Sequence, residues 1–160
     1  MKIKVGFGYD VHRLENGFPL YIGGIKVEHE KGAVGHSDAD VLIHAIMDAL
    51  LGAAGLRDIG YHFPDTDPDL KGIDSKILLR KVLKLLIDKG FRIGNIDATV
   101  ALQQPKIGLR IPEMQNTLAE ILQTPEEDIS VKATTTEKLG FVGEEAGIAA
   151  FATVLIIKEL

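Results

Sequence analysis

The beginning of the chain alternates between apolar and other residues, which is the pattern of a strand with two different faces. Between residues 2 and 12, five apolar side chains fall on one face, whereas two lysines, two glycines, Asp10 and His12 fall on the other. Residues 91–103 alternate in the same way and end at Gln104-Pro105-Lys106, where proline interrupts a strand. Each of these two stretches therefore predicts one strand.

Other apolar runs predict the rest of a sheet. Residues 20–22 and 25–27 flank Gly23-Gly24 and predict a short hairpin. Residues 129–134 predict a further strand, and residues 148–158 are almost continuously apolar, which is typical of a buried central strand. We therefore expect four main strands in a mixed sheet, with the small hairpin in addition.

Three segments repeat apolar residues at the spacing of an amphipathic helix. These predicted helices are residues 38–54, 75–89 and 112–122. Ser37 or Asp38 is available as the N-cap of the first helix and Asp74 as that of the second, and the third has proline in its first turn. Residues 124–127 predict a capped single turn.

The segment from Arg57 to Gly72 is rich in proline, aspartate and glycine, so we predict an irregular loop. No repeat, linker or low-complexity tract divides the chain, and a length of 160 residues suits one domain. The expected fold is α+β, a single domain over residues 1–160. It is a two-layer sandwich of three main helices on a mixed four-stranded sheet.

Composition narrows the possible functions. With 46% hydrophobic residues the chain is not disordered, and a net charge of −5 argues against general attraction to nucleic acid. Because there is no cysteine, a metal ion would be held by histidine and carboxylate. The N-terminus lacks the apolar core of a signal peptide, and the longest apolar run is far shorter than the roughly 20 residues of a membrane span. We therefore expect a cytoplasmic protein.

Asp10 and His12 carry the clearest chemical signal, because residues two apart on a strand project from the same face and can contact one ligand. His44, in the first predicted helix, is the third candidate. A set of two histidines and one carboxylate leaves a tetrahedral metal ion one open position, which is typical of a catalytic site. The alternative is a surface pair at Asp10 and His12 and a hydrogen-bonded core histidine at His44.

Polar residues around His44 have both a chemical and a structural interpretation. His36 and Ser37 precede the first predicted helix, where free N–H groups favour a phosphate, although Ser37 could simply cap the helix. Asp40 and Asp48 stand at helical spacing from His44. One of them could orient the imidazole as a hydrogen-bond acceptor, or both could be solvated carboxylates.

The predicted loop adds two carboxylates, Asp58 and Asp65. They could accept hydrogen bonds from a polyol or form turns, which is the commoner use of aspartate in loops. His29 and His62 have no motif around them, so we interpret both as ordinary surface or loop histidines. Gly6-Phe7-Gly8 is only half of a dinucleotide fingerprint and no helix follows directly, so a Rossmann site is not expected.

A second dense cluster of polar groups follows the predicted strand 129–134. Residues 132–141 contain three threonine hydroxyls, one carboxylate and two ammonium groups. The hydroxyls could donate to phosphate oxygens while Glu137 binds a hard cation, since Mg²⁺ takes one or two carboxylates and completes its shell with phosphate. The structural alternative is a capping box formed by Thr134 and Glu137.

Taken in order, six blocks of this sequence resemble the 2-C-methyl-D-erythritol 2,4-cyclodiphosphate synthase family. The blocks are Asp10-Val11-His12, His36-Ser37-Asp38-x-Asp40-x-x-x-His44, Asp58-Ile59-Gly60, Phe63-Pro64-Asp65-Thr66-Asp67, Pro105-Lys106 and Lys132-Ala133-Thr134-Thr135-Thr136-Glu137-Lys138-Leu139-Gly140-Phe141. The resemblance covers essentially the whole chain. It implies that 4-diphosphocytidyl-2-C-methyl-D-erythritol 2-phosphate cyclises with release of CMP, an intramolecular phosphoryl transfer in non-mevalonate isoprenoid biosynthesis.

The resemblance also implies roles for individual residues. Zn²⁺ would be held by Asp10, His12 and His44, and Mg²⁺ or Mn²⁺ by Glu137 together with the substrate diphosphate. The transition state would be stabilised by His36 and Thr135. The implied substrate contacts are Asp10, His12, His36, Ser37, Asp58, Ile59, Gly60, Phe63, Asp65, Thr66, Asp67, Pro105, Lys106, Thr134, Thr135, Thr136, Glu137 and Phe141.

The resemblance further implies a homotrimer with active sites between neighbouring subunits. One departure follows Phe141. Members of the family can carry an arginine after Phe-x-Gly, proposed to meet an isoprenoid diphosphate on the threefold axis, whereas this chain has Glu144. Its carboxylate would repel such an anion, so we do not expect that effector to bind here in the same way.

Two other functions fit parts of the pattern. A metal-dependent phosphohydrolase would use the same ligands to activate water and would release phosphate from simple esters. A non-enzymatic binding module would use zinc structurally, with its fourth position closed by protein, but His29 and His62 lack a suitable context. We favour the cyclising enzyme, a phosphorus–oxygen lyase.

Overall fold

Five strands form a mixed sheet in the order β4-β1-β7-β5-β6 in the computed structural model, which describes residues 1–159. The strands are β1 (Lys2–Asn16), β4 (Lys31–Val34), β5 (Arg92–Ala101), β6 (Ile129–Thr134) and β7 (Gly147–Lys158). Neighbouring strands run antiparallel except β5 and β6, which are parallel. A separate two-stranded hairpin pairs β2 (Leu20–Ile22) with β3 (Ile25–Val27), as predicted.

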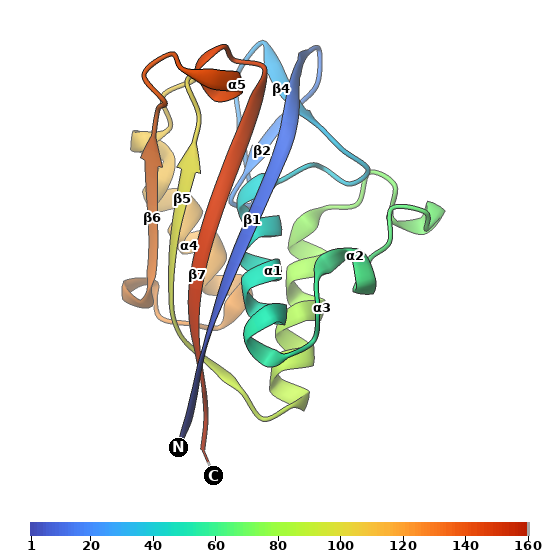
Figure 1. The fold of residues 1–160 in the computed structure, drawn as a ribbon, viewed down its shortest axis with the longest axis vertical. Helices are drawn as coiled ribbons and strands as arrows, with labels where there is room; N and C mark the ends of the chain where they lie inside the picture. The colour runs from blue at the N-terminus through green and yellow to red at the C-terminus, as the bar shows by residue number, and fades with distance from the viewer. Residues whose placement is uncertain (160) are drawn as a thin grey trace.

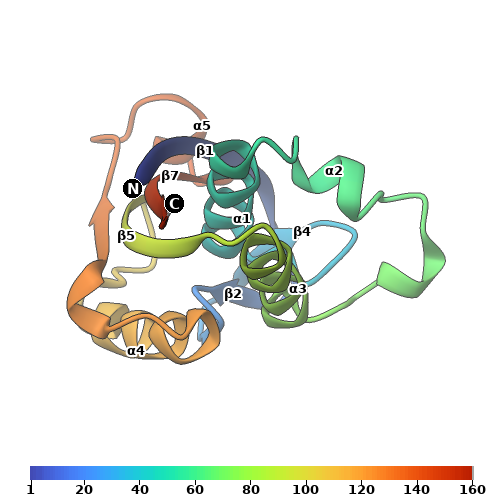
Figure 2. The same ribbon diagram turned by 90° about the horizontal axis from the view of Figure 1, so that it is seen from below.

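Three long helices cover one face of this sheet, as Figures 1 and 2 show. They are α1 (Val41–Ala54), α3 (Ser75–Asp88) and α4 (Ile111–Leu122). The shorter helical elements are α2 (Ile59–His62), α5 (Gly140–Gly143), η1 (Pro68–Leu70), η2 (Gly108–Arg110) and η3 (Glu126–Asp128). Figure 2 shows that the segment carrying α2 extends to one side of the helical layer. No helix within residues 1–159 is long and apolar enough to cross a membrane.

The predicted α+β arrangement of helices on a mixed sheet is confirmed, and β7 lies at its centre. The prediction of four strands is wrong, because the edge strand β4 has only four residues and no alternation. It pairs with the end of β1, which continues to Asn16 rather than ending at His12. The segment 57–72 is also less irregular than predicted, since it contains the short helices α2 and η1.

The N-terminus of α1 differs from the prediction as well. The helix begins at Val41, and its N-cap is Asp40 rather than Ser37 or Asp38. The Asp40 carboxylate is fully buried and accepts hydrogen bonds from the backbone N–H groups of Ile43, Gly23 and Gly24 at 2.7–3.0 Å. The cap therefore also ties the β2–β3 hairpin to α1.

Helix α1 packs directly on β1 because two residues of the strand have no side chain. A Cβ atom on Gly6 would lie 2.0 Å from the carbonyl oxygen of Ala49, and one on Gly8 would lie 1.9 Å from that of Ala45. Both distances are far below van der Waals contact, so only glycine permits this approach. The half fingerprint at residues 6–8 therefore has a packing role, consistent with the absence of a Rossmann site.

The opposite face of the sheet is apolar and exposed. Five side chains of β1 point to this face and are 43–65% exposed: Ile3, Val5, Phe7, Tyr9 and Val11. Phe151 of β7 lies beside them, with its ring centroid 5.1 Å from that of Tyr9. Figure 1 shows no helix in front of β1 and β7 on this side. Contiguous apolar surface of this kind marks an interaction site.

Candidate metal centre

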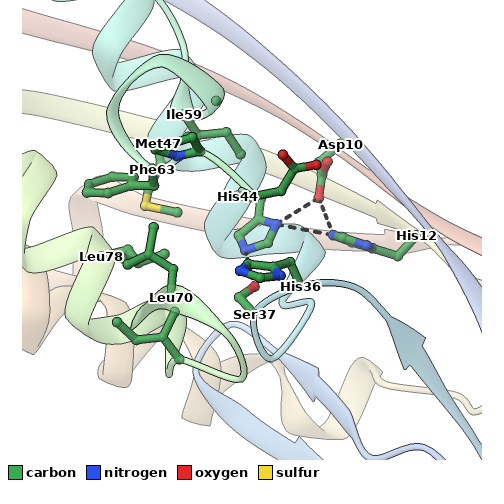
Figure 3. Close-up of a pocket in the computed structure, with 14 residues that line it drawn as sticks. Asp10, His12, His36, Ser37, His44, Met47, Ile59, Phe63, Leu70 and Leu78 are labelled. Carbon is green, nitrogen blue, oxygen red and sulfur yellow. Dashed lines mark hydrogen bonds and ion pairs between the residues drawn. The ribbon is translucent and has the colours of Figure 1, made fainter. Parts of the chain in front are cut away.

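Strand β1 and helix α1 bring Asp10, His12 and His44 to one point (Figure 3). The Oδ2 atom of Asp10 is 2.8 Å from Nε2 of His12 and 3.1 Å from Nδ1 of His44, and the two ring nitrogens are 3.1 Å apart. Ligands bound at about 2.0–2.1 Å in a tetrahedral set lie about 3.3 Å from one another. The spacing of these three atoms therefore fits one small metal ion.

Both imidazoles have a second hydrogen-bonding partner on the side away from this point. His12 donates from Nδ1 to the carbonyl oxygen of Val34 at 3.0 Å, which leaves the lone pair of its Nε2 for the centre. His44 has its Nε2 within 2.9 Å of the hydroxyl of Ser75 and 3.2 Å of the hydroxyl of Ser37. Outer contacts of this kind orient histidine ligands in metal sites.

The charges of Asp10 and His12 are coupled. Burial would raise the pKa of the Asp10 carboxyl, but its contacts with the imidazoles of His12 and His44 outweigh burial and lower the pKa to about 2. Burial would lower the pKa of the His12 imidazole, but the hydrogen bond with Asp10 outweighs it and raises the pKa above 6.5. The site therefore favours a positive charge, either a proton or a metal ion, between these groups.

The three residues open onto a cavity of about 400 Å³, within the usual range for small-molecule sites. Its polar end is formed by the predicted metal ligands together with His36 and Ser37. Figure 3 shows an apolar end opposite, lined by Met47, Phe63, Leu70 and Leu78. The cavity therefore suits a ligand that combines an anionic group with a small, partly apolar body.

Residues of the segment 57–72 close one side of the cavity. Ile59, Gly60, Phe63 and Asp65, four of the predicted substrate contacts, line it. Asp58 instead forms a turn, because its carboxylate is the N-cap of α2 and accepts from the N–H of Tyr61 at 2.9 Å.

The neighbouring loop residues are held by backbone contacts. Asp67 caps η1 with its carboxylate and accepts a hydrogen bond from His36 Nε2 on its carbonyl oxygen at 2.9 Å. Thr66 is exposed and lies outside the residues that line the cavity. His62 donates to the carbonyl oxygen of Leu56 at 2.7 Å, and His29 is half-buried after β3.

Neither Asp40 nor Asp48 orients His44, so that prediction is wrong. Asp40 is committed to the three N–H groups at the start of α1, and burial raises its pKa. Asp48 accepts from the N–H of Ile59 at 2.9 Å and so holds α2 against α1; burial raises its pKa as well. The contact to His44 comes from Ser75, which the sequence pattern marks only as a residue at the start of a helix.

The second group of predicted residues lies elsewhere on the chain. Pro105, Lys106, Thr134 and Thr135 line a separate cavity of about 270 Å³ beside β6. The residues Thr136, Glu137 and Phe141 line neither this cavity nor the first. Within one chain, the predicted site residues therefore form two groups.

The structural alternative for Thr134 and Glu137, a capping box, is wrong. Thr134 donates from its hydroxyl to the carbonyl oxygen of Thr135, and α5 begins only at Gly140. Glu137 is exposed and has a positive φ of 53°. Its side chain is therefore free of any helix-capping role.

Comparisons with known proteins agree on one family. A family model described as the YgbB family matches residues 3–157. The 2-C-methyl-D-erythritol 2,4-cyclodiphosphate synthase of Porphyromonas gingivalis is 64% identical over 154 residues, covering 96% of this chain and 95% of that protein.

Solved structures give the same result. The bifunctional IspDF of Campylobacter jejuni matches with a TM-score of 0.93 and 42% identity, over 97% of this chain and 42% of that longer one. The CDP-bound form of a 2C-methyl-D-erythritol-2,4-cyclodiphosphate synthase matches with a TM-score of 0.89 and 36% identity, over 96% of this chain and 100% of that one. With a family model matched over residues 3–157 and a relative 64% identical over almost its full length, the chain belongs to the YgbB family.

Proposed function

We propose that this protein converts 4-diphosphocytidyl-2-C-methyl-D-erythritol 2-phosphate into 2-C-methyl-D-erythritol 2,4-cyclodiphosphate and CMP, as a cyclising phosphorus–oxygen lyase. The observation that carries the proposal is the convergence of Asp10, His12 and His44 at the polar end of a cavity of about 400 Å³. Relatives up to 65% identical bear the name of this synthase. The geometry and the family therefore support the same reaction.

The donor set of two imidazoles and one carboxylate suits Zn²⁺, which we propose as the ion held by Asp10, His12 and His44. When bound, it supplies a Lewis acid that polarises a phosphoryl oxygen. Asp10, His12 and His44 would supply three of its ligands and would leave a position for that oxygen. The open side of the three residues faces the cavity, where the phosphate of a substrate would lie.

The reaction makes modest demands on the remaining residues. The 2-phosphate is largely ionised at neutral pH because its second pKa is about 6, so it can attack without a strong general base. Alignment of two ends of one molecule can lower the barrier by about 7–11 kcal/mol. We assign this alignment to the cavity, with the methylerythritol unit against Phe63, Ile59 and Gly60 and its hydroxyls near Asp65. Asp58, which caps α2, would contact the hydroxyls from beside the cavity.

His36 and Thr135 are proposed to stabilise the transition state. The Thr135 hydroxyl can donate to a phosphate oxygen, and His36 can do so from Nε2 once that N–H leaves the carbonyl oxygen of Asp67. His36 lines the first cavity and Thr135 the second. Glu137 would hold Mg²⁺ or Mn²⁺ with the substrate diphosphate, since an exposed carboxylate can share a hard cation with phosphate oxygens. The cytidyl end would contact Pro105 and Lys106, together with Thr134 and Thr136 beside them.

We propose a homotrimer whose active sites lie between subunits. Two observations support it: the predicted site residues that line a cavity are divided between two separate cavities of one chain, and the apolar face of β1 is exposed. Contact between chains would place the second cavity of one subunit beside the metal centre of the next. We also propose a cytoplasmic location, because the proposed reaction is a biosynthetic one.

The experiment that tests the function is phosphorus NMR of the products formed from the cytidyl substrate with Zn²⁺ and Mg²⁺. The proposal predicts that a cyclic diphosphate and CMP appear together in equal amounts, and that both are absent with His44→Ala. The matched control is Ile87→Asp, an exposed position near the C-terminal end of α3, and this variant should retain activity. Release of inorganic phosphate instead of the cyclic product would show a phosphohydrolase.

A further inference from the structure

The metal centre is supported from behind by a third element, the N-terminus of α3. Ser75, the first residue of that helix, is fully buried, and its hydroxyl oxygen lies 2.9 Å from Nε2 of His44. This contact is made by Nε2, whereas Nδ1 of the same ring faces Asp10 and His12. None of the six sequence blocks described above contains Ser75.

The direction of the hydrogen bonds fixes where the proton of His44 sits. The Ser75 hydroxyl has one hydrogen, and it donates this hydrogen to the Oδ1 atom of Asp38, because a carboxylate can only accept. Toward His44 the hydroxyl is therefore an acceptor, and Nε2 must carry the imidazole proton. The lone pair of His44 is then on Nδ1, the atom that faces Asp10 and His12.

Asp38 is itself held from several sides. Its Oδ2 atom accepts from the backbone N–H of Ser75 at 3.0 Å, and Oδ1 also accepts from the N–H of Asp40 at 3.2 Å. Its own N–H donates to the carbonyl oxygen of Ile73 at 3.0 Å. These bonds keep the carboxylate facing the Ser75 hydroxyl, so the hydroxyl has little freedom to turn and donate to His44 instead.

Ser37 is the competing partner of His44, and the geometry favours Ser75. The Ser37 hydroxyl is 3.2 Å from Nε2, which is 0.3 Å farther than that of Ser75, and Ser37 is only half-buried. Its oxygen already accepts from the N–H of Ala39 at 3.2 Å. Because Ser37 also lines the cavity, its hydroxyl is available to a ligand, whereas Ser75 is enclosed by protein.

We propose that Ser75 and Asp38 are positioning residues that hold His44 in the one tautomer and orientation that can bind the metal ion. The inference deepens the proposed function and rests on a metal ion at Asp10, His12 and His44. In metalloproteins, the hydrogen-bond partners of metal-binding histidines contribute about 10–100-fold to metal affinity. The helix N-terminus of α3 thereby becomes part of the metal centre without contacting the metal ion.

The test is the affinity of the full-length protein for Zn²⁺, measured by competition with a chromophoric chelator, and the visible spectrum of the Co²⁺-loaded protein. The variants are Ser75→Ala, which removes the acceptor, Ser75→Thr, which keeps a hydroxyl, and Asp38→Asn, which removes one of the acceptor oxygens. The matched control is Asp74→Ala, since Asp74 caps the same helix through Lys76 N–H but does not contact Ser75 Oγ. Ser37→Ala tests the competing partner.

We expect Ser75→Ala to weaken Zn²⁺ binding by about 10–100-fold and Asp38→Asn by about tenfold, with a changed Co²⁺ spectrum in both. Ser75→Thr, Ser37→Ala and Asp74→Ala should remain within about threefold of the unmodified protein, well below that range. If Ser75→Ala does not fold, Asp38→Asn, which leaves the Ser75 side chain in place, carries the test.

Three results would overturn the inference. The first is Ser75→Ala with the affinity of the unmodified protein, and the second is a larger loss in Ser37→Ala than in Ser75→Ala. An equal loss in Asp74→Ala would also overturn it, because helix stability rather than the hydroxyl would then be the cause. An unmodified protein that binds no Zn²⁺ would contradict the metal centre of the proposed function instead, so the two failures are distinguishable.

Discussion

At the scale of single residues, the metal centre depends on two glycines that have no chemical role. Gly6 and Gly8 let α1 approach β1, and that approach brings His44 to Asp10 and His12. Alternation along β1 predicted two faces but not which of them is buried; the apolar face is the exposed one. The pair at residues 10 and 12 was predictable from strand geometry. The contact of Ser75 with His44 was not, because it depends on the packing of α3 near α1, which no local sequence pattern indicates.

Replacement of Gly8 should therefore damage both stability and metal binding. In Gly8→Ala the new Cβ atom would meet the backbone oxygen of Ala45 at 1.9 Å, so α1 must move away and carry His44 with it. We expect a loss of about 1–3 kcal/mol in the free energy of unfolding, with weaker Zn²⁺ binding. Urea denaturation and chelator competition measure the two effects.

The control for Gly8→Ala is Gly52→Ala, a substitution in α1 itself. A Cβ atom on Gly52 meets nothing within 4 Å, and its φ is not positive. Gly52→Ala should therefore leave metal affinity unchanged and stabilise the helix by up to about 1 kcal/mol. Equal effects of the two substitutions would contradict the close approach of α1 to β1.

Zinc affinity should also depend on pH, because a proton competes for the same site. The hydrogen bond with Asp10 raises the pKa of His12 above 6.5, against the opposing effect of burial, so His12 is protonated as the pH falls through that raised value. Each displaced proton lowers the apparent affinity about tenfold per pH unit below the pKa. Zn²⁺ titrations between about pH 8 and pH 5 should show a constant affinity at high pH and then a fall as the pH decreases. If the Zn²⁺ affinity did not change across that range, the competition between the proton and the metal ion would be contradicted.

At the scale of secondary-structure elements, helix existence was predictable and helix ends were less so. The stripes of α1, α3 and α4 predicted all three helices, but the N-cap of α1 lies at Asp40 because the β2–β3 hairpin supplies two further N–H groups to that carboxylate. Strand β4 was missed because its pairing with the end of β1 is a tertiary contact. The short helices in 57–72 were missed because their aspartates and proline suggested a loop. Asp58 and Asp67 are in fact the N-caps of α2 and η1, and Pro68 is in the first turn of η1.

Loss of the Asp40 cap should destabilise the molecule strongly. Asp40→Ala leaves three backbone N–H groups without their acceptor in a fully buried position, so we expect a loss of about 3 kcal/mol in the free energy of unfolding. Asp40→Asn keeps one oxygen and should lose less. Denaturation at one fixed protein concentration compares them, since association also contributes to apparent stability. Equal stability of Asp40→Ala and the unmodified protein would contradict the cap.

At the scale of the whole molecule, the uncovered face of the sheet and the two separate cavities point to assembly. The arrangement of helices on a mixed sheet was predictable from the spacing of apolar residues alone, because the helices and the sheet must each bury an apolar face against the other. The two cavities that the predicted site residues line were not predictable from spacing, since residues 105–106 and 134–135 meet through the parallel pair β5 and β6. The resemblance alone implied a shared site.

A charge on the apolar face should dissociate the assembly. Phe7 is 65% exposed at the centre of that face, so Phe7→Asp would place a carboxylate within the contact between subunits. We expect the mass in solution to fall from three times to one times the 17.4 kDa chain, and cyclase activity to fall with it. Ile87→Asp, on α3, is the control and should remain trimeric in light scattering. A trimeric Phe7→Asp would exclude this face as the interface.

The most direct measurement is anomalous diffraction at the zinc edge from crystals grown with Zn²⁺ and CDP. We predict one zinc ion per chain, at about 2.0–2.2 Å from Oδ2 of Asp10, Nε2 of His12 and Nδ1 of His44, with phosphate or water as the fourth ligand. The cytosine should lie against Pro105 and Lys106 of the adjacent subunit. A zinc ion elsewhere, or a fourth ligand from a protein side chain, would contradict the catalytic metal centre.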